Sequence, residues 1–85
     1  FTKIAKRHEL HVELETRQDL KLLVNYLREN CIQINAIEKN DAYASSGLSV
    51  YTINIAILKS KKQSLVDTID MIKELEYVNY VEEIY

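Results

Sequence analysis

Alternating apolar and polar residues predict three strands, over residues 8–15, 31–40 and 48–59. The third is the most regular, because one side of it is almost entirely β-branched. Its expected core face holds Tyr51, Ile53, Ile55 and Ile57, and its other face holds Val50, Thr52, Asn54 and Ala56. A fourth strand is expected over residues 77–85. Its apolar residues recur every three positions, which indicates a β-bulge or a short final strand with a frayed end.

Two stretches between these strands have apolar residues at helical spacing. The first helix is expected to begin at Thr16, with Asp19 three residues later in an arrangement close to a capping box. We expect it to end at Asn30, because asparagine tolerates the left-handed conformation at helix ends. The second is expected to begin at Ser60, with Gln63 in the matching position. The apolar stripes are Leu20, Leu23, Val24 and Leu27 in the first helix, and Leu65, Val66, Ile69, Ile72 and Leu75 in the second.

This order of elements predicts a single α+β domain over residues 1–85, a ferredoxin-like βαββαβ two-layer sandwich. Each helix has one apolar stripe to bury, so both helices are expected on one face of a four-stranded antiparallel sheet. The right-handed crossover rule puts the first and third strands at the centre. The predicted core comprises Leu10, Val12, Leu23, Leu27, Ile53, Ile55, Ile69 and Ile72.

The composition of the chain excludes several classes of function. The chain has a net charge of -2, whereas nucleic-acid-binding domains usually carry a basic excess, so we expect no nucleic-acid partner. Cys31 is the only cysteine, which rules out an internal disulfide, and we expect it to be a small buried residue after the first helix. No Gly-rich phosphate loop, nucleophile elbow or Cys-His pair is evident. We therefore expect a non-catalytic domain without a cofactor.

The sheet face without helices is the expected place of function. Glu9, His11 and Glu13 share one side of the first strand and could ligate a metal such as Zn²⁺. No further ligand is evident, so a solvated strand face is the simpler interpretation. His8 points to the other side near the start of the strand, where a hydrogen-bonded or a fraying histidine is expected rather than a ligand. The candidate interaction surface consists of His11, Glu13, Gln33, Asn35, Val50, Thr52 and Asn54.

Apolar residues on the same face favour a protein partner or self-association. Leu48, Val50 and Leu58, with Ile37 from the second strand, are expected to form an exposed apolar patch. The second strand is also an edge strand with no proline and no charge before Glu38. We therefore expect a weak homodimer through that strand, through the face around Val50, or through both.

The layout resembles the ACT-like regulatory domains. The helical stretch from Asp19 to Leu27 and the strand opening at Ile32 carry this resemblance. Within that class the chain looks most like the C-terminal domain of MgtC/SapB-type membrane proteins. The resembling segments are Arg7-His-Glu-Leu-His-Val-Glu-Leu14, Ile34-Asn-Ala-Ile-Glu38 and Leu75-Glu-Tyr-Val-Asn-Tyr-Val81.

This resemblance implies a cytoplasmic regulatory domain of a bacterial inner-membrane protein associated with magnesium limitation and virulence. The start at Phe1, followed by basic Lys3, Lys6 and Arg7, suits a junction with a membrane segment. The alternative is a soluble ACT-like sensor of a small molecule, such as an amino acid, in a metabolic enzyme. Amino-acid-binding ACT domains usually have a glycine in the loop after the first strand, and this chain has Thr16-Arg17-Gln18 there.

Overall fold

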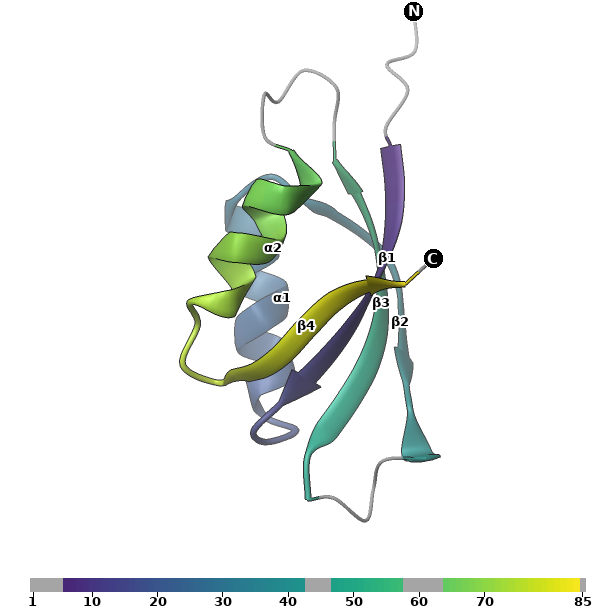
Figure 1. Cartoon of the computed structure of the whole chain (residues 1–85), viewed down its shortest axis with the longest axis vertical. Coiled ribbons are helices and arrows are strands. Elements are labelled where there is room, and N and C mark those ends of the chain that lie inside the picture. The colour runs from purple at the N-terminus through teal and green to yellow at the C-terminus, as the bar shows by residue number, and fades with distance from the viewer. Residues whose placement is uncertain (1–5, 43–46, 58–63, 85) are drawn as a thin grey trace, which may run out of the picture.

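The computed structural model describes residues 6–42, 47–57 and 64–84. They form four strands and two helices in the order β-α-β-β-α-β (Figure 1). The elements are β1 (Lys6–Leu14), α1 (Asp19–Glu29), β2 (Gln33–Lys39), β3 (Ser49–Ile57), α2 (Leu65–Lys73) and β4 (Val78–Ile84).

The four strands form one antiparallel sheet in the order β2-β3-β1-β4. Both helices lie on the same face of this sheet, and the opposite face carries no helix (Figure 1). Strands β1 and β3 are central and β2 and β4 are the edges, as the crossover rule predicts. The predicted ferredoxin-like sandwich is therefore confirmed.

The core lies between the sheet and the helices. Of the predicted core residues, only Ile69 is partly rather than fully buried. The prediction for Val66 is wrong, because this side chain is 67% exposed. Thr68 takes the inward position on α2 instead and is 0% exposed. Its hydroxyl donates a hydrogen bond to the backbone oxygen of Ser64 at 3.0 Å, which makes a polar side chain compatible with the core.

A bulge in β4 explains the three-residue spacing between Val78 and Val81. Leu14 of β1 pairs with Val78, but Glu13 pairs with Tyr80, so Asn79 is an extra residue in β4. The extra residue shifts the alternation by one position, and Val78 and Val81 both reach the core. The expected bulge is confirmed.

A second bulge, in β2, was not expected. Ile34 pairs with Ile55 and Ala36 pairs with Asn54, so Asn35 is the extra residue. Beyond the bulge Ile37 pairs with Ile53, a core residue, and therefore lies on the helix-facing side. The prediction that Ile37 belongs to the uncovered face is wrong, because a single extra residue reverses the facing of every later side chain.

The helix starts also differ from expectation. Helix α1 begins at Asp19, and Thr16 lies in the turn before it, where its N–H and hydroxyl both donate to the Asp19 carboxylate at 2.9 Å. Helix α2 begins at Leu65 after a complete capping box between Ser64 and Asp67. The capping residues expected for this helix, 60 and 63, lie outside the described residues.

Helix α1 ends in a Schellman motif, which corrects two expectations. The N–H of Ile32 donates to the oxygen of Leu27, and the N–H of Cys31 donates to the oxygen of Arg28. The left-handed residue of the motif is Cys31, with φ 61°, whereas Asn30 has φ -94°. Cys31 is exposed and not buried, because Ile32, which belongs to the same core cluster as Leu27, takes the apolar position of the motif.

Replacing Cys31 with glycine is expected to stabilise the domain by about 0.5–1 kcal/mol. Glycine adopts a positive φ without the clash of a Cβ atom, and this gain exceeds the extra freedom glycine has in the unfolded chain. Urea unfolding of both proteins measures the difference. The control is Asn30→Gly, at negative φ, which is expected to be neutral or destabilising. Equal destabilisation by both substitutions would contradict the left-handed assignment.

Candidate interaction surface

The uncovered sheet face is acidic. The strand registers place four carboxylates on it, and Arg7 is the only lysine or arginine of the described strands that shares it. Glu9 and Glu13 come from β1, Glu38 from β2 and Glu82 from β4. This face therefore favours a cationic partner and disfavours contact with the same face of a second copy.

His11 lies at the centre of this face, between Thr52 of β3 and Glu82 of β4. Its Nε2 lies 2.8 Å from a carboxylate oxygen of Glu13, two residues along the same strand. Its ring also meets the ring of Tyr80 edge-on, with centroids 6.2 Å apart and planes at 65°. These contacts hold the imidazole in place beside carboxylates from two strands.

Tyr80 connects the edge strand β4 to this centre. Its hydroxyl donates a hydrogen bond of 2.8 Å to the Glu82 carboxylate. That bond raises the pKa of Tyr80 above its ordinary value, and partial burial and the charges of Glu82 and Glu13 act in the same direction. The hydroxyl is therefore protonated and remains a donor throughout the physiological pH range.

Amides occupy the other half of the face. The side-chain amide of Asn35 donates to the Asn54 side-chain oxygen at 3.1 Å, and that of Gln33 donates to Asn35 at 3.1 Å. The bulge at Asn35 gives β2 an additional side chain on this face. Unlike the histidine side of the face, this chain of amides is uncharged.

The prediction that Val50 forms part of an exposed apolar patch is wrong. The register places Val50 on the uncovered face opposite Glu13, but its side chain is only 2% exposed. Ala56, on the same face, is also 2% exposed, and Leu48 is half-buried. Leu58, the fourth expected member of the patch, lies outside the described residues. The uncovered face presents polar groups rather than an apolar patch at these positions.

The remaining predicted surface residues divide into two groups. His11, Glu13 and Thr52 lie together at the centre, and Gln33, Asn35 and Asn54 form the amide chain. Sequence reasoning missed Tyr80 and Glu82, whose facing depends on the bulge at Asn79. Whether these residues bind a partner remains a prediction.

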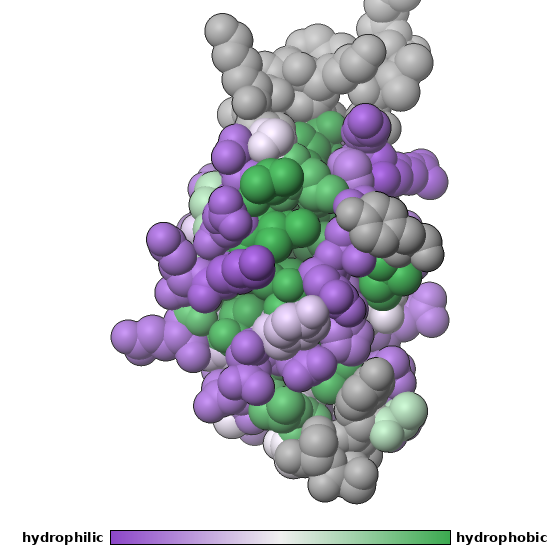
Figure 2. Space-filling view, viewed as in Figure 1, coloured by the Kyte–Doolittle hydropathy of each residue, from purple (hydrophilic) through white to green (hydrophobic). Residues whose placement is uncertain are grey.

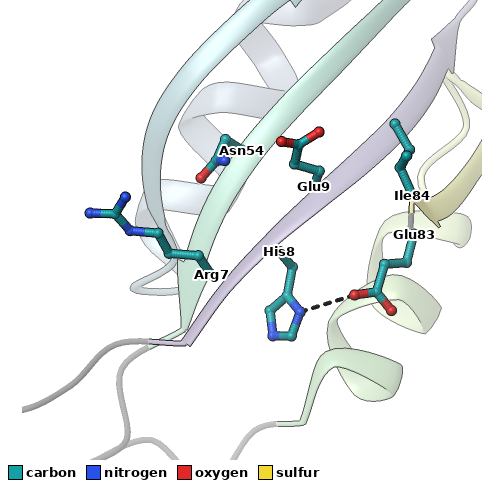
Figure 3. A pocket seen from close by; sticks show the side chains of 6 residues that line it. All are labelled: Arg7, His8, Glu9, Asn54, Glu83 and Ile84. Carbon is teal, nitrogen blue, oxygen red and sulfur yellow. Dashed lines mark hydrogen bonds and ion pairs between the residues drawn. The ribbon is translucent and has the colours of Figure 1, made fainter.

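A hollow of about 420 Å³ lies where β1 continues past the end of β4 (Figure 3). His8 points toward Glu83, and its Nδ1 lies 3.1 Å from the Glu83 carboxylate (Figure 3). Glu9 and Asn54 lie on the other side of β1 in this view. The expectation of a hydrogen-bonded His8 is confirmed. The contact between His8 and Glu83 lies at a half-buried position, and none of the described residues that line the hollow is a serine, threonine or cysteine nucleophile.

Among residues 6–42, 47–57 and 64–84, no three His, Cys, Asp or Glu side chains are grouped so that they could hold a metal ion. Glu9 illustrates the reason, since it pairs with Asn54 and Ile84 on the flanking strands rather than with further ligands. The acidic face is therefore a distributed surface and not a coordination cage.

Apolar side chains also gather on another side of the molecule. On the side where α2 and β4 lie nearest the viewer, Figure 2 shows a strip of them with polar residues on both sides. The exposed large apolar residues of these two elements are Val66, Tyr80 and Ile84, at 67%, 46% and 39% exposed. Val66 belongs to α2, whereas the register of β4 places Tyr80 and Ile84 on the uncovered face, opposite Glu13 and Glu9.

We compared the chain and its fold with known proteins. No protein-family model matches the chain, and no curated protein matches it. Solved structures do match, among them the C-terminal domain of the MgtC protein from Mycobacterium tuberculosis and the ACT domain from GTP pyrophosphokinase of Chlorobium tepidum. The first has a TM-score of 0.63 at 12% identity over 94% of this chain and 86% of that one. The second has a TM-score of 0.57 at 15% identity over 95% of this chain and 100% of that one.

The fold is ACT-like. At these identities the two matches establish the architecture, and the site must be argued from the residues of this chain. The structural resemblance to the MgtC C-terminal domain agrees with the resemblance noted in the sequence. In the described part of this ACT-like chain, no helix is long and apolar enough to cross a membrane.

Proposed function

We propose that this ACT-like chain is a non-catalytic regulatory domain that acts by protein–protein contact, and that it forms a weak homodimer through the free edge of β2. The observation that carries this proposal is the exposure of that edge. All residues of β2 except Ile34 are exposed, and no described element pairs with its outer side. A sheet edge of this kind can pair with another strand.

The backbone groups available for pairing follow from the register. The N–H of Asn40 donates to the oxygen of Val50, so Asn40 points toward β3. In an antiparallel pair the backbone N–H groups of successive residues point alternately toward the paired strand and away from it. The N–H groups of Ile37 and Lys39 therefore point away from β3, toward a partner.

Two observations support β2 over the other dimer surface that the sequence suggested. Val50 is buried, and the uncovered face carries four carboxylates that would repel the same face of a second copy. The bulge at Asn35 limits regular pairing to the segment that follows it, because bulges twist an edge away. Such a short contact supports a transient dimer rather than a permanent one.

For the parent protein, we propose a bacterial inner-membrane protein of the MgtC type, linked to magnesium limitation and virulence, with this domain on the cytoplasmic side. The fold match to the MgtC C-terminal domain and the sequence segments quoted above support this proposal. The residues that precede Phe1 in the full protein test it. Several apolar spans of about 20 residues are expected there, and a soluble enzyme domain would contradict the proposal.

A soluble small-molecule sensor is the second candidate, because the fold also matches an ACT domain from an enzyme. Arg17, in the loop where such domains usually have glycine, borders a hollow on α1. Glycine allows the backbone to approach a ligand closely, and a residue with a side chain at this position hinders such an approach. This departure makes the contact function the better supported of the two.

The Ile37→Pro variant tests the edge contact. Proline removes the outward N–H at the middle of the regular edge segment without breaking a bond to β3. Sedimentation velocity from 10 to 500 µM is expected to show a concentration-dependent dimer for the natural chain and at least tenfold weaker dimerisation for the variant.

The matched control is Ile37→Thr, which shortens the side chain and keeps the N–H. It is expected to dimerise within about threefold of the natural chain. Equal loss in both variants would assign the contact to the isoleucine side chain. A natural chain that stays monomeric at 500 µM would remove the dimer from the proposal.

A further inference from the structure

Helix α1 carries a row of basic side chains beside two half-buried apolar ones. Arg17, Lys21 and Arg28 are exposed, and Leu20 and Val24 lie between them. Together with Gln18 and Asn25 these residues line a hollow of about 500 Å³, here called the α1 groove. No acidic residue of the described chain lines it, although acidic residues outnumber basic ones in the sequence, 13 to 11.

The groove lies on the flank of α1 that faces away from α2. The opposite flank carries Asp19 and Tyr26. Burial raises the pKa of the hydroxyl of Tyr77, at the end of the α2–β4 connection, and the charges of Asp19 and Tyr26 raise it further, so both lie near Tyr77. Figure 1 shows α2 and β4 nearest the viewer with α1 and β2 behind them, and the groove is thus on the β2 side. The three cations form no ion pair with any described residue.

The form of the groove decides what kind of partner it can take. All described lining residues come from α1 and the turn before it, so a small molecule would remain largely in solvent. Leu20 and Val24 are half-buried, so they expose little apolar surface for insertion into a bilayer. Lys21 and Arg28, both in α1, are seven residues apart, about 10 Å along the helix axis, and Arg17 in the preceding turn extends the row further. This length fits the face of another helix that carries carboxylates and a projecting apolar side chain.

Helix α2 presents such a face. Val66, Asp70 and Glu74 follow each other at four-residue intervals and therefore share one side of the helix. Val66 is 67% exposed, and the two carboxylates are exposed and form no ion pair with any described residue. Lys73 is the only cation of α2, so the face remains acidic.

We propose that the α1 groove of one copy binds the outer face of α2 of a second copy. Val66 would pack on Leu20 and Val24, while Asp70 and Glu74 would meet the basic row. The two surfaces differ, so the contact is head-to-tail and leaves a free groove at one end and a free α2 at the other. This second mode of self-association is independent of the β2 edge and produces species larger than a dimer.

A charge swap tests this contact, and the Ile37→Pro background removes the edge contact from the measurement. Sedimentation velocity in 20 mM salt is expected to show association that rises with concentration to 500 µM and weakens at least tenfold in 500 mM salt. Lys21→Glu and Asp70→Lys are each expected to weaken it at least tenfold. The double variant Lys21→Glu/Asp70→Lys is expected to recover to within about threefold of the background, because the opposite charges meet again.

The control exchanges a cation outside the groove and off the β2 edge, Arg7→Glu on the uncovered face, and is expected to change association by less than threefold. If Ile37→Pro lowers the stability of the domain, the same four variants are measured in the natural background instead. Failure of the double variant to recover, or salt-independent association, would overturn the proposal. Absence of any association up to 500 µM would also overturn it and leave the groove to an acidic helix of another protein.

Discussion

Replacing Ile55 with alanine is expected to lower the free energy of unfolding by about 2–5 kcal/mol. Ile55 lies on the central strand β3, between His8 of β1 and Ile34 of β2, and its side chain is 0% exposed. It belongs to the cluster that joins the sheet to both helices, so its removal leaves a cavity that the neighbours cannot fill. Urea denaturation followed by circular dichroism measures the loss.

The matched control for this prediction is Ile84→Ala, at an isoleucine of the edge strand β4 that is 39% exposed. We expect it to cost less than about 1 kcal/mol, since less apolar surface is lost and no closed cavity forms. Equal losses at the two positions, or a loss below about 1 kcal/mol at Ile55, would mean that the facing of β3 is wrongly assigned.

Replacing Val50 with aspartate is expected to destabilise the domain by about 3 kcal/mol or more, the scale of an unpaired buried charge. Val50 is 2% exposed although it lies on the face without helices, and it pairs with Glu13, whose carboxylate would repel the new one. The loss should appear as a lower midpoint of thermal unfolding, recovered in part at pH 4, where the introduced carboxyl group becomes protonated.

The control, Thr52→Asp, lies two residues further along the same face at a half-buried position beside His11. A carboxylate there remains accessible to water, and we expect a change within about 1 kcal/mol. Similar effects of the two substitutions would show that the uncovered face is uniformly accessible, contrary to the burial of Val50.

The sequence was sufficient to predict the layers, the strand order and most of the core. Ile53 and Ile55 alternate with polar residues along β3, and Leu23 and Leu27 recur at helical spacing, so their facing follows from periodicity alone. The crossover rule then sets the order of the strands. These features depend on regular repetition, which a single sequence displays directly.

The wrong predictions fall where the regular alternation of a strand or the regular spacing of a helix is interrupted. The bulge at Asn35 moves Ile37 to the helix-facing side, and the bulge at Asn79 brings Tyr80 and Glu82 to the uncovered face. An extra residue of this kind has no reliable signature when the bulged residue is an ordinary asparagine rather than glycine. Cys31 was misplaced because a left-handed cysteine is rare, and the pattern gave no reason to expect one.

The candidate site was predictable only in part. The alternation on β1 placed His11 and Glu13 on the uncovered face, but the burial of Val50 depends on packing that no local pattern encodes. The acidic character of the face likewise emerges only when four strands are brought together, since Glu38 and Glu82 are far apart in the chain.

Amide hydrogen exchange at the edge of β2 tests the central claim most directly. Exchange measured by nuclear magnetic resonance at 20 and 500 µM distinguishes the amides of Ile37 and Lys39, which point outward, from that of Asn40, which bonds to Val50. Pairing of two β2 edges predicts that exchange at Ile37 and Lys39 slows at least fivefold at the higher concentration, while exchange at Asn40 changes less than twofold. Fast exchange at Ile37 and Lys39 that does not depend on concentration would contradict it.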